Sequence, residues 1–187
     1  MTPLRHQMRR RDVPGTARFL TFSCYRRLAL FRNDKIKDAF AGALAQAAAR
    51  HNAAVLAWVV MPEHVHLVVY ADPPESVSTF LRSLKCPLAS AVLARWRTLD
   101  APILNRLRNT AGKCHFWQLG GGYDRNVVDR ELVEKIRYVH ANPIRRGLSP
   151  DSVGWGWSSA ATYRAKPDAI GPPIAFDLIP TYHGDLT

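Results

Sequence analysis

The chain has 187 residues, of which 47% are hydrophobic and 22% charged, a composition typical of one folded domain and not of a disordered chain. No segment reaches the roughly 18 consecutive apolar residues of a membrane helix, and three cysteines are too few and too scattered for a disulfide framework. These features exclude an integral membrane protein and a disulfide-rich secreted protein. We therefore expect a cytoplasmic, single-domain protein.

An excess of positive charge gives the first indication of a partner. Lys and Arg number 26 and Asp and Glu 15, so the net charge is +11. Basic residues concentrate in residues 1–37, which hold ten basic and two acidic residues, and in residues 82–113, which hold seven and one. Such an excess favours a polyanionic partner, most often nucleic acid. A basic surface that only keeps the protein in solution is the alternative.

The domain organisation is simple, because no repeat or low-complexity linker divides the chain. We predict a basic arm over residues 1–15, one domain over 16–163 and a C-terminal tail over 164–187. Residues 147–187 contain most of the later Pro and Gly together with Trp155 and Trp157, and we expect this C-terminal part to wrap over the domain.

The first half of the domain predicts three strands and a helix. Residues 16–25 are rich in Phe, Thr and Tyr and predict a strand. A helix follows from a cap at Asn33 or Asp34 to about residue 51, with apolar residues every three or four positions. Residues 55–61 and 64–70 predict a hairpin around the turn Pro62-Glu63.

The second half begins with a long helical segment. Residues 76–97 predict a helix that Pro87 should kink or split. Residues 99–114 predict a basic connector, and residues 116–119 a short strand that the Gly120–Gly122 run ends.

A last helix is expected from an Asp129 cap to Asn142, because Pro143 disfavours helical geometry in the residue before it. The resulting order β-α-β-β-α-β-α predicts an α+β fold. We expect a ferredoxin-like antiparallel sheet with the helices packed on one face.

The pair His64 and His66 is the sharpest local motif. Alternate strand residues face the same side, so the two imidazoles lie side by side, roughly 7 Å apart at Cα, while Val65, Leu67 and Val69 face a core. Two such histidines could hold a divalent cation with a third ligand from elsewhere. Two ordinary half-buried histidines are the other interpretation.

The last predicted helix places polar residues outside its apolar stripe. At 100° per residue, the stripe consists of Leu132, Val133, Ile136 and Val139. Tyr138 lies well away from it, and Asn142 lies on the same face one turn later. This face could bring a nucleophile and a metal-binding oxygen to one place. His140 falls on the core side and is interpreted as a packing residue.

Several blocks together resemble a known family. The segment Met61–Val69 (MPEHVHLVV) resembles the HUH motif of the single-tyrosine transposases. Similarity to their REP-associated branch is carried by Phe116–Gln118, Tyr123-Asp124, Tyr138–Pro143, Arg146–Leu148 and Trp155–Ser159. The blocks occur in order over roughly residues 15–163. The loop Leu119–Gly122 departs from the family pattern, which puts DNA contacts there in question.

The resemblance implies an HUH-nuclease fold and a site. His64, His66 and Asn142 would bind a divalent metal ion, Mg²⁺ or Mn²⁺, and Tyr138 would be the nucleophile. The substrate would be single-stranded DNA with REP-type hairpins, cut through a 5′-phosphotyrosine intermediate. The resemblance also implies a nucleoid-associated monomer, although a dimer is not excluded.

Basic residues are expected to hold the DNA. They are Arg5, Arg9, Arg10 and Arg11 in the arm, Arg95, Arg97, Arg106 and Arg108 in the second basic region, and Lys135, Arg145 and Arg146 around the last helix. Lys135 could activate Tyr138 or hold a phosphate, or it could only pair with Glu131. Trp96 could stack on a base or pack in the core.

The function that we predict is a metal-dependent DNA nickase and strand transferase. Two alternatives remain open: a catalytically inactive hairpin-binding protein of the same fold, and a phosphohydrolase in which water attacks and Tyr138 only binds. A covalent protein–DNA adduct distinguishes the first function from both others.

Overall fold

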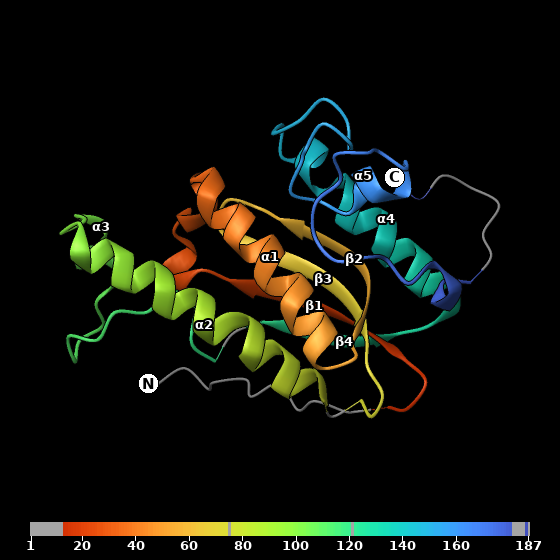
Figure 1. Cartoon of the computed structure of the whole chain (residues 1–187), viewed down its shortest axis with the longest axis horizontal. Coiled ribbons are helices and arrows are strands. Elements are labelled where there is room, and N and C mark those ends of the chain that lie inside the picture. Colours follow the sequence, from red (N-terminus) through yellow and green to blue (C-terminus); the bar gives the residue numbers. More distant parts are fainter. Residues whose placement is uncertain (1–12, 75, 121, 181–185, 187) are drawn as a thin grey trace, which may run out of the picture.

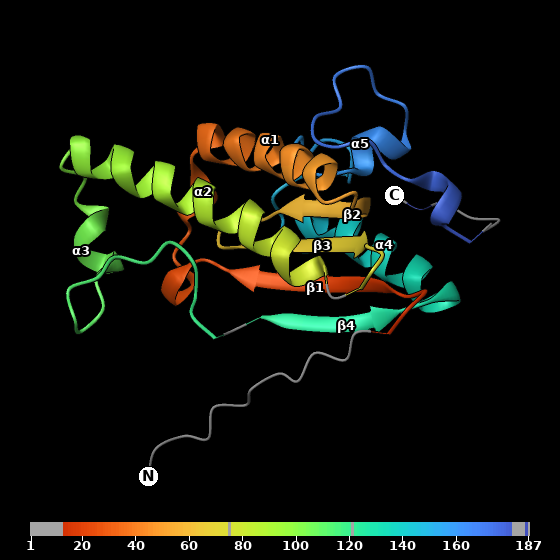
Figure 2. The same cartoon turned by 60° about the horizontal axis from the view of Figure 1, so that its bottom comes forward.

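The computed structural model describes residues 13–74, 76–120, 122–180 and 186. Its centre is one antiparallel sheet with the strand order β2-β3-β1-β4 (Figures 1 and 2). The strands are β1 (Ala17–Ser23), β2 (Ala54–Val60), β3 (His64–Tyr70) and β4 (Tyr123–Val127). The predicted α+β class and antiparallel sheet are confirmed.

The described helices surround this sheet. The α-helices are α1 (Asp34–Arg50), α2 (Ser76–Thr98), α3 (Ile103–Leu107), α4 (Asp129–Arg145) and α5 (Ala160–Tyr163). Short 3-10 helices are η1 (Tyr25–Arg27), η2 (Leu30–Arg32) and η3 (Phe176–Leu178). No described helix is both long enough and apolar enough to cross a membrane.

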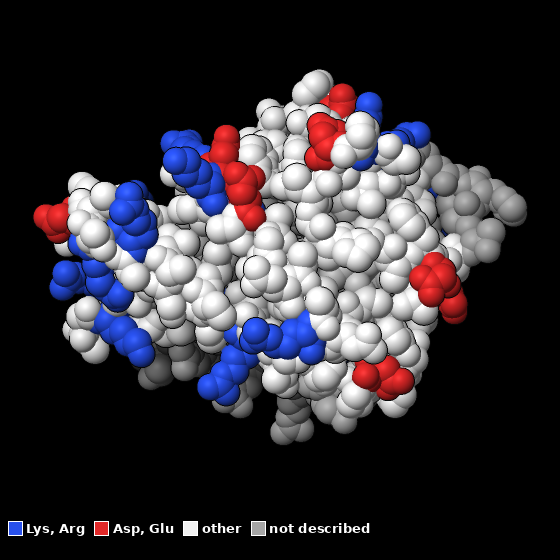
Figure 3. Space-filling view, in the orientation of Figure 1, with Lys and Arg blue, Asp and Glu red and all other residues white. Residues whose placement is uncertain are grey.

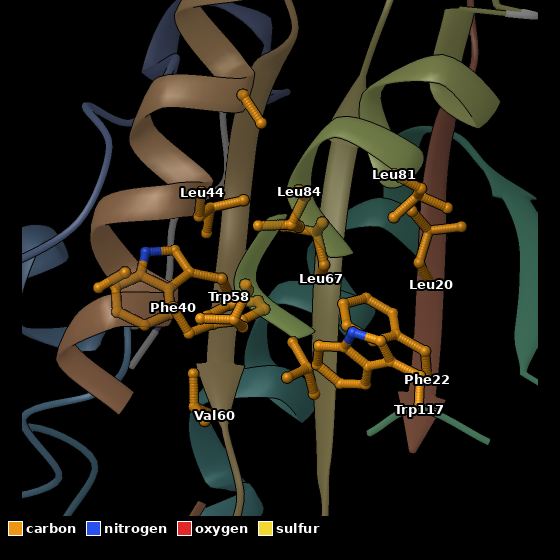
Figure 4. Packing of buried hydrophobic residues seen from close by; sticks show 14 of the residues in the cluster. Leu20, Phe22, Phe40, Leu44, Trp58, Val60, Leu67, Leu81, Leu84 and Trp117 are labelled. Atoms are coloured by element: carbon orange, nitrogen blue, oxygen red, sulfur yellow. The ribbon is translucent and has the colours of Figure 1, made fainter. Parts of the chain in front are cut away.

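The larger hydrophobic core lies between the sheet and the helices α1 and α2. Figure 4 shows Phe40 and Leu44 of α1 and Leu84 of α2 packed against Trp58 and Leu67 of the sheet. All five side chains are fully buried. This packing stabilises the side of β3 opposite the two histidines.

Helix α4 covers the other face of the sheet, so the helices do not all share one face as we had expected. Leu132, Ile136 and Val139 of α4 form a second core with Phe19 and Val68 of the strands. The reason is that the strands are apolar on both sides, and each apolar face must be covered. The two histidines of β3 lie on this second face.

The fourth strand is not where the sequence pattern predicts it. Trp117 makes only an isolated bridge to Cys24, and the aromatic residues of the segment 116–119 are buried in the larger core. The strand β4 comes later, with the polar sequence YDRNV. It joins β1 at the sheet edge, where the ion pair between Arg18 and Asp124 is buried. Long-range pairing therefore overrides the weak strand propensity of Asp and Asn.

Two prolines interrupt helices less than predicted. Helix α4 continues through Pro143 and ends at Arg145. Gly147, directly after the C-cap residue Arg146, has a φ of 63°, the left-handed conformation that favours glycine. Helix α2 is not split, because Pro87 is exposed and the flanking Leu84 and Leu88 are anchored in the core.

The C-terminal tail packs on the domain. Ile174 is buried in the larger core. Gly171 lies against the Trp58 ring so closely that a Cβ there would come within 2.5 Å of it. The predicted wrapping of the tail is therefore observed for its described residues. The basic arm up to residue 12 lies outside the described residues.

Candidate metal and nucleophile site

The two histidines of β3 form the centre of the candidate site. Both are buried, and their Nε2 atoms lie 3.0 Å apart. Val65 and Leu67 face the opposite core, as the alternation of strand residues predicts.

The Nδ1 atoms of both rings have partners. His64 Nδ1 lies 3.1 Å from Glu63 Oε1. A carboxylate only accepts hydrogen bonds, so His64 Nδ1 is the donor and its Nε2 carries a lone pair when the ring is neutral. His66 Nδ1 lies 2.7 Å from Thr21 Oγ1, on the residue directly opposite it in β1. These contacts fix how both rings are turned.

Burial favours the neutral form of both rings. Burial and the neighbouring charge of His64 lower the pKa of His66 to about 3, against the opposing effect of Asn142. Burial also lowers the pKa of His64, although the Glu63 carboxylate opposes it. Neutral imidazole is the form that binds a metal.

The donor set fits a divalent cation. Two buried imidazole Nε2 atoms lie 3.0 Å apart, and neutral imidazole nitrogen is a common ligand of divalent metal ions. Among the described residues, no group of three or more His, Cys, Asp or Glu side chains could hold a metal ion. Asn142, whose side chain interacts with His66, is the notable neutral residue at this place and could offer its amide oxygen as a further ligand.

Helix α4 brings Tyr138 and Asn142 to the histidines. The Tyr138 ring lies 5.3 Å from the His66 ring and 5.8 Å from the Phe19 ring, between centroids. Asn142 is buried, and its Nδ2 donates to Tyr138 O at 2.6 Å. This bond uses the amide nitrogen and leaves the amide oxygen for other contacts. The four residues predicted from β3 and α4 thus converge.

Cationic side chains surround Tyr138. Lys135 Nζ lies 5.9 Å and the Arg145 guanidinium 5.4 Å from the centre of the Tyr138 ring. Glu131 pairs with Arg125, so the alternative pairing of Lys135 with Glu131 is not observed. Two cations therefore lie near the Tyr138 ring.

Arg146 follows α4 and pairs with Glu63. Its Nη1 donates to Glu63 Oε1 at 2.9 Å, and about half of its side chain remains exposed. Burial alone would raise the pKa of Glu63, but Arg146 and the charge of His64 together hold it below its usual value.

The second basic region lies elsewhere. Arg95 and Arg97 near the end of α2, Arg106 in α3 and Arg108 after it are all exposed. They belong to the end of the molecule that projects away from α4, where blue side chains gather on the left of Figure 3. Trp96 stacks on the buried Phe116, with ring centroids 6.0 Å apart, which favours the core interpretation. The predicted arginines at positions 5, 9, 10 and 11 lie outside the described residues.

Sequence reasoning missed three residues of the site. Phe19 and Thr21 belong to β1, and nothing in the sequence pairs them with His66. Glu63 stands beside His64 in the motif, and this adjacency to a candidate ligand was the available signal. The interpretation of His140 as a packing residue agrees with its full burial and its contact with Ser159 Oγ at 2.8 Å.

Comparison with known proteins identifies the family. The family model described as "Transposase IS200 like" matches residues 16–142, which is more than half of the chain and includes all four converging residues. The chain belongs to the IS200-like transposase family. A search of curated protein sequences finds no significant match to this transposase.

A solved structure with a TM-score above 0.5 shows that the fold is shared. A REP-associated tyrosine transposase, bound to a REP hairpin in its structure, matches this transposase with a TM-score of 0.63 and 18% identity, over 96% of this chain and 92% of that chain. A proposed transposase from Deinococcus radiodurans R1 gives a TM-score of 0.44 and 19% identity, over 70% of this chain and 94% of that chain.

Proposed function

We propose that this transposase is a metal-dependent endonuclease and strand transferase that acts on single-stranded DNA at REP-type hairpins. The observation that carries the proposal is the contact between the Tyr138 ring and the His66 ring, 5.3 Å apart. Through this contact, the proposed nucleophile on α4 lies next to the proposed cation site on β3. The likeness to a hairpin-bound transposase supports the hairpin as the DNA form.

In the proposed reaction, Tyr138 Oη loses its proton and attacks a backbone phosphorus. The new bond joins Oη to phosphorus, and the bond from phosphorus to the 3′ oxygen breaks. That oxygen takes up a proton and leaves as a free 3′-hydroxyl. The DNA stays attached as a 5′-phosphotyrosine, and a 3′-hydroxyl of another strand can later displace the tyrosine without ATP.

The chain's own residues prepare this step. His64, His66 and Asn142 would hold the cation, Mg²⁺ or Mn²⁺, which when bound would neutralise charge on the scissile phosphate. Lys135 and Arg145 attract the phosphate to the ring of Tyr138. Phe19 supports the rings of both His66 and Tyr138 and so keeps them in one arrangement.

A covalent adduct tests the proposal. Oligonucleotides with an imperfect hairpin and single-stranded flanks, labelled at the 3′ end, are incubated with protein and Mn²⁺ and separated on denaturing gels. The unmodified protein should retain the label as a protein–DNA band, and Tyr138→Phe should lose it while keeping hairpin affinity within about three-fold. Tyr70→Phe, at the opposite end of β3 from His64, is the matched control and should form the adduct.

Each other outcome would support a different function for this protein. An adduct formed by Tyr138→Phe would disprove the assignment of the nucleophile. Cleavage without any adduct would favour the phosphohydrolase, and hairpin binding without cleavage would favour the inactive binding protein.

A further inference from the structure

A second group of residues faces the same side of the sheet as His66. Tyr123 of β4 is directly opposite Thr21 of β1, which is directly opposite His66 of β3. One row across three strands therefore runs from the candidate metal site to the sheet edge. The next row brings Arg125 opposite Phe19.

This part of the face remains accessible among the described residues. Helix α4 packs on β2 and β3, whereas Tyr123 is 43% exposed and the Arg125 side chain 53%. The Tyr123 ring and the Arg125 guanidinium therefore keep surface that a ligand can contact.

The rings of Tyr123 and Tyr138 have a common neighbour. Both pack edge-on against Phe19, at 5.7 Å and 5.8 Å between centroids. Gly122 allows β4 to approach β1 this closely, because a Cβ at Gly122 would lie 2.8 Å from Thr21 O. The glycine run that departs from the family pattern thus ends in a residue that positions Tyr123.

Two cations and one carboxylate lie around this part of the face. The guanidinium of Arg125 interacts with the Tyr123 side chain and pairs with Glu131 at 2.9 Å. Lys135 Nζ lies 5.4 Å from the Phe19 ring that supports Tyr123. An aromatic face bordered by cations is suited to an unpaired base and its phosphate, since every base can stack and every nucleotide carries a negative charge.

We propose that Tyr123 and Arg125 form a subsite for one unpaired nucleotide close to the cleaved phosphate, with the base stacked on Tyr123 and a phosphate bound by Arg125. The subsite rests on the proposed function for the position of the cut. It concerns single-stranded DNA, because the bases of a duplex have no free face for Tyr123 to stack on.

Binding is measured without cleavage, in the Tyr138→Phe background and without metal. The probe is a short fluorescent oligothymidylate, followed by anisotropy. Tyr123→Ala should weaken binding about five-fold or more, and Tyr123→Phe should stay within about two-fold of the parent, because Phe keeps the stacking face. Arg125→Ala should weaken binding and lower the salt dependence by about 0.7 in log–log slope. Arg50→Ala, at the end of α1, should change neither the affinity nor its salt dependence.

A cross-linking measurement does not depend on the variants' folding. The same oligothymidylate with one 5-iodouracil should cross-link to Tyr123 in the parent protein, as mapped by mass spectrometry. No cross-link at Tyr123, no binding by the parent, or equal binding by Tyr123→Ala would each overturn the subsite. A change of oligomeric state in Tyr123→Ala with unchanged DNA affinity would show that this edge binds protein instead.

The subsite proposal and the proposed nuclease activity can be disproved independently. If the unmodified protein forms the adduct and Tyr123→Ala binds DNA as well as the parent, only the subsite proposal is disproved. If Tyr123 cross-links in a protein that never forms an adduct, only the proposed cleavage reaction is disproved.

Discussion

Arg146 donates a hydrogen bond from Nη1 to Glu63 Oε1 at 2.9 Å. The same oxygen faces His64 Nδ1 at 3.1 Å. One carboxylate oxygen therefore joins the start of β3, which carries the histidines, to the end of α4, which carries Tyr138 and Asn142. Because the carboxylate is an obligate acceptor, it also keeps the hydrogen of His64 on Nδ1 and the Nε2 lone pair toward His66.

We predict that Glu63→Gln weakens Mn²⁺ binding by about 10- to 100-fold, the usual loss when the partner of a metal-binding histidine is removed. The amide of Gln can donate to Nδ1 and so favour the other tautomer of His64. Titration calorimetry with Mn²⁺ measures the change. Glu134→Gln, on the exposed side of α4, is the control. Equal affinities for the parent and Glu63→Gln would rule out this role.

Stability should depend on pH through His66. Its folded-state pKa of about 3 lies below the ordinary value of 6.5, so between these values the unfolded chain binds a proton that the folded chain does not. Stability should therefore fall as the pH drops through this window, by up to about 1.4 kcal/mol per pH unit. Above the pH window, the contribution of His66 to stability no longer changes with pH.

Urea unfolding of the metal-free protein from about pH 7 to about pH 4 measures this dependence. The variant His66→Gln lacks the titrating group, so its stability should fall less steeply over the same range. Parallel curves for the parent and the variant would contradict the assignment of this dependence to His66.

The tail is attached through Gly171, where φ is 97° and a Cβ would lie 2.5 Å from Trp58 Cζ2. We predict that Gly171→Ala lowers the free energy of unfolding by about 1–3 kcal/mol, because the backbone conformation and the fully buried ring both resist the methyl group. Chemical denaturation measures the loss. Gly42→Ala, inside α1 with no atom near its Cβ position, should instead stabilise by up to about 1 kcal/mol. Two variants of equal stability would be inconsistent with this close contact.

Lys37 links α1 to the segment that follows α4. Its Nζ lies 3.4 Å from the centre of the Trp157 ring and 2.9 Å from Asp34 Oδ1, and the residue is only 4% exposed. Lys37→Met keeps the length of the side chain but removes its charge. We expect a loss of about 1–2 kcal/mol in the free energy of unfolding, measured in urea.

Lys35→Met serves as the comparison for Lys37→Met, because Lys35 is exposed on the same helix. It should change stability by less than about 0.5 kcal/mol. If both variants lose the same small amount, the cation–π contact contributes nothing measurable.

The sequence alone determined the relations that depend on local geometry. His64 and His66 share a face because strand residues alternate, and Tyr138 and Asn142 share a face because a helix turns once in about 3.6 residues. Both relations are observed, and so is the α+β class that follows from the order of the elements. The match to the family model, over residues 16–142, includes all four of these residues.

Only the tertiary structure decided which elements meet. Three relations follow from the strand order β2-β3-β1-β4 and from α4 crossing the second face. Thr21 contacts His66, Tyr123 lies two strands away from His66, and Arg146 reaches Glu63. Local patterns do not contain this information, since strand pairing and layer choice depend on burying apolar surface from distant segments at once. For the same reason, the polar segment YDRNV is a strand and the aromatic segment 116–119 is not.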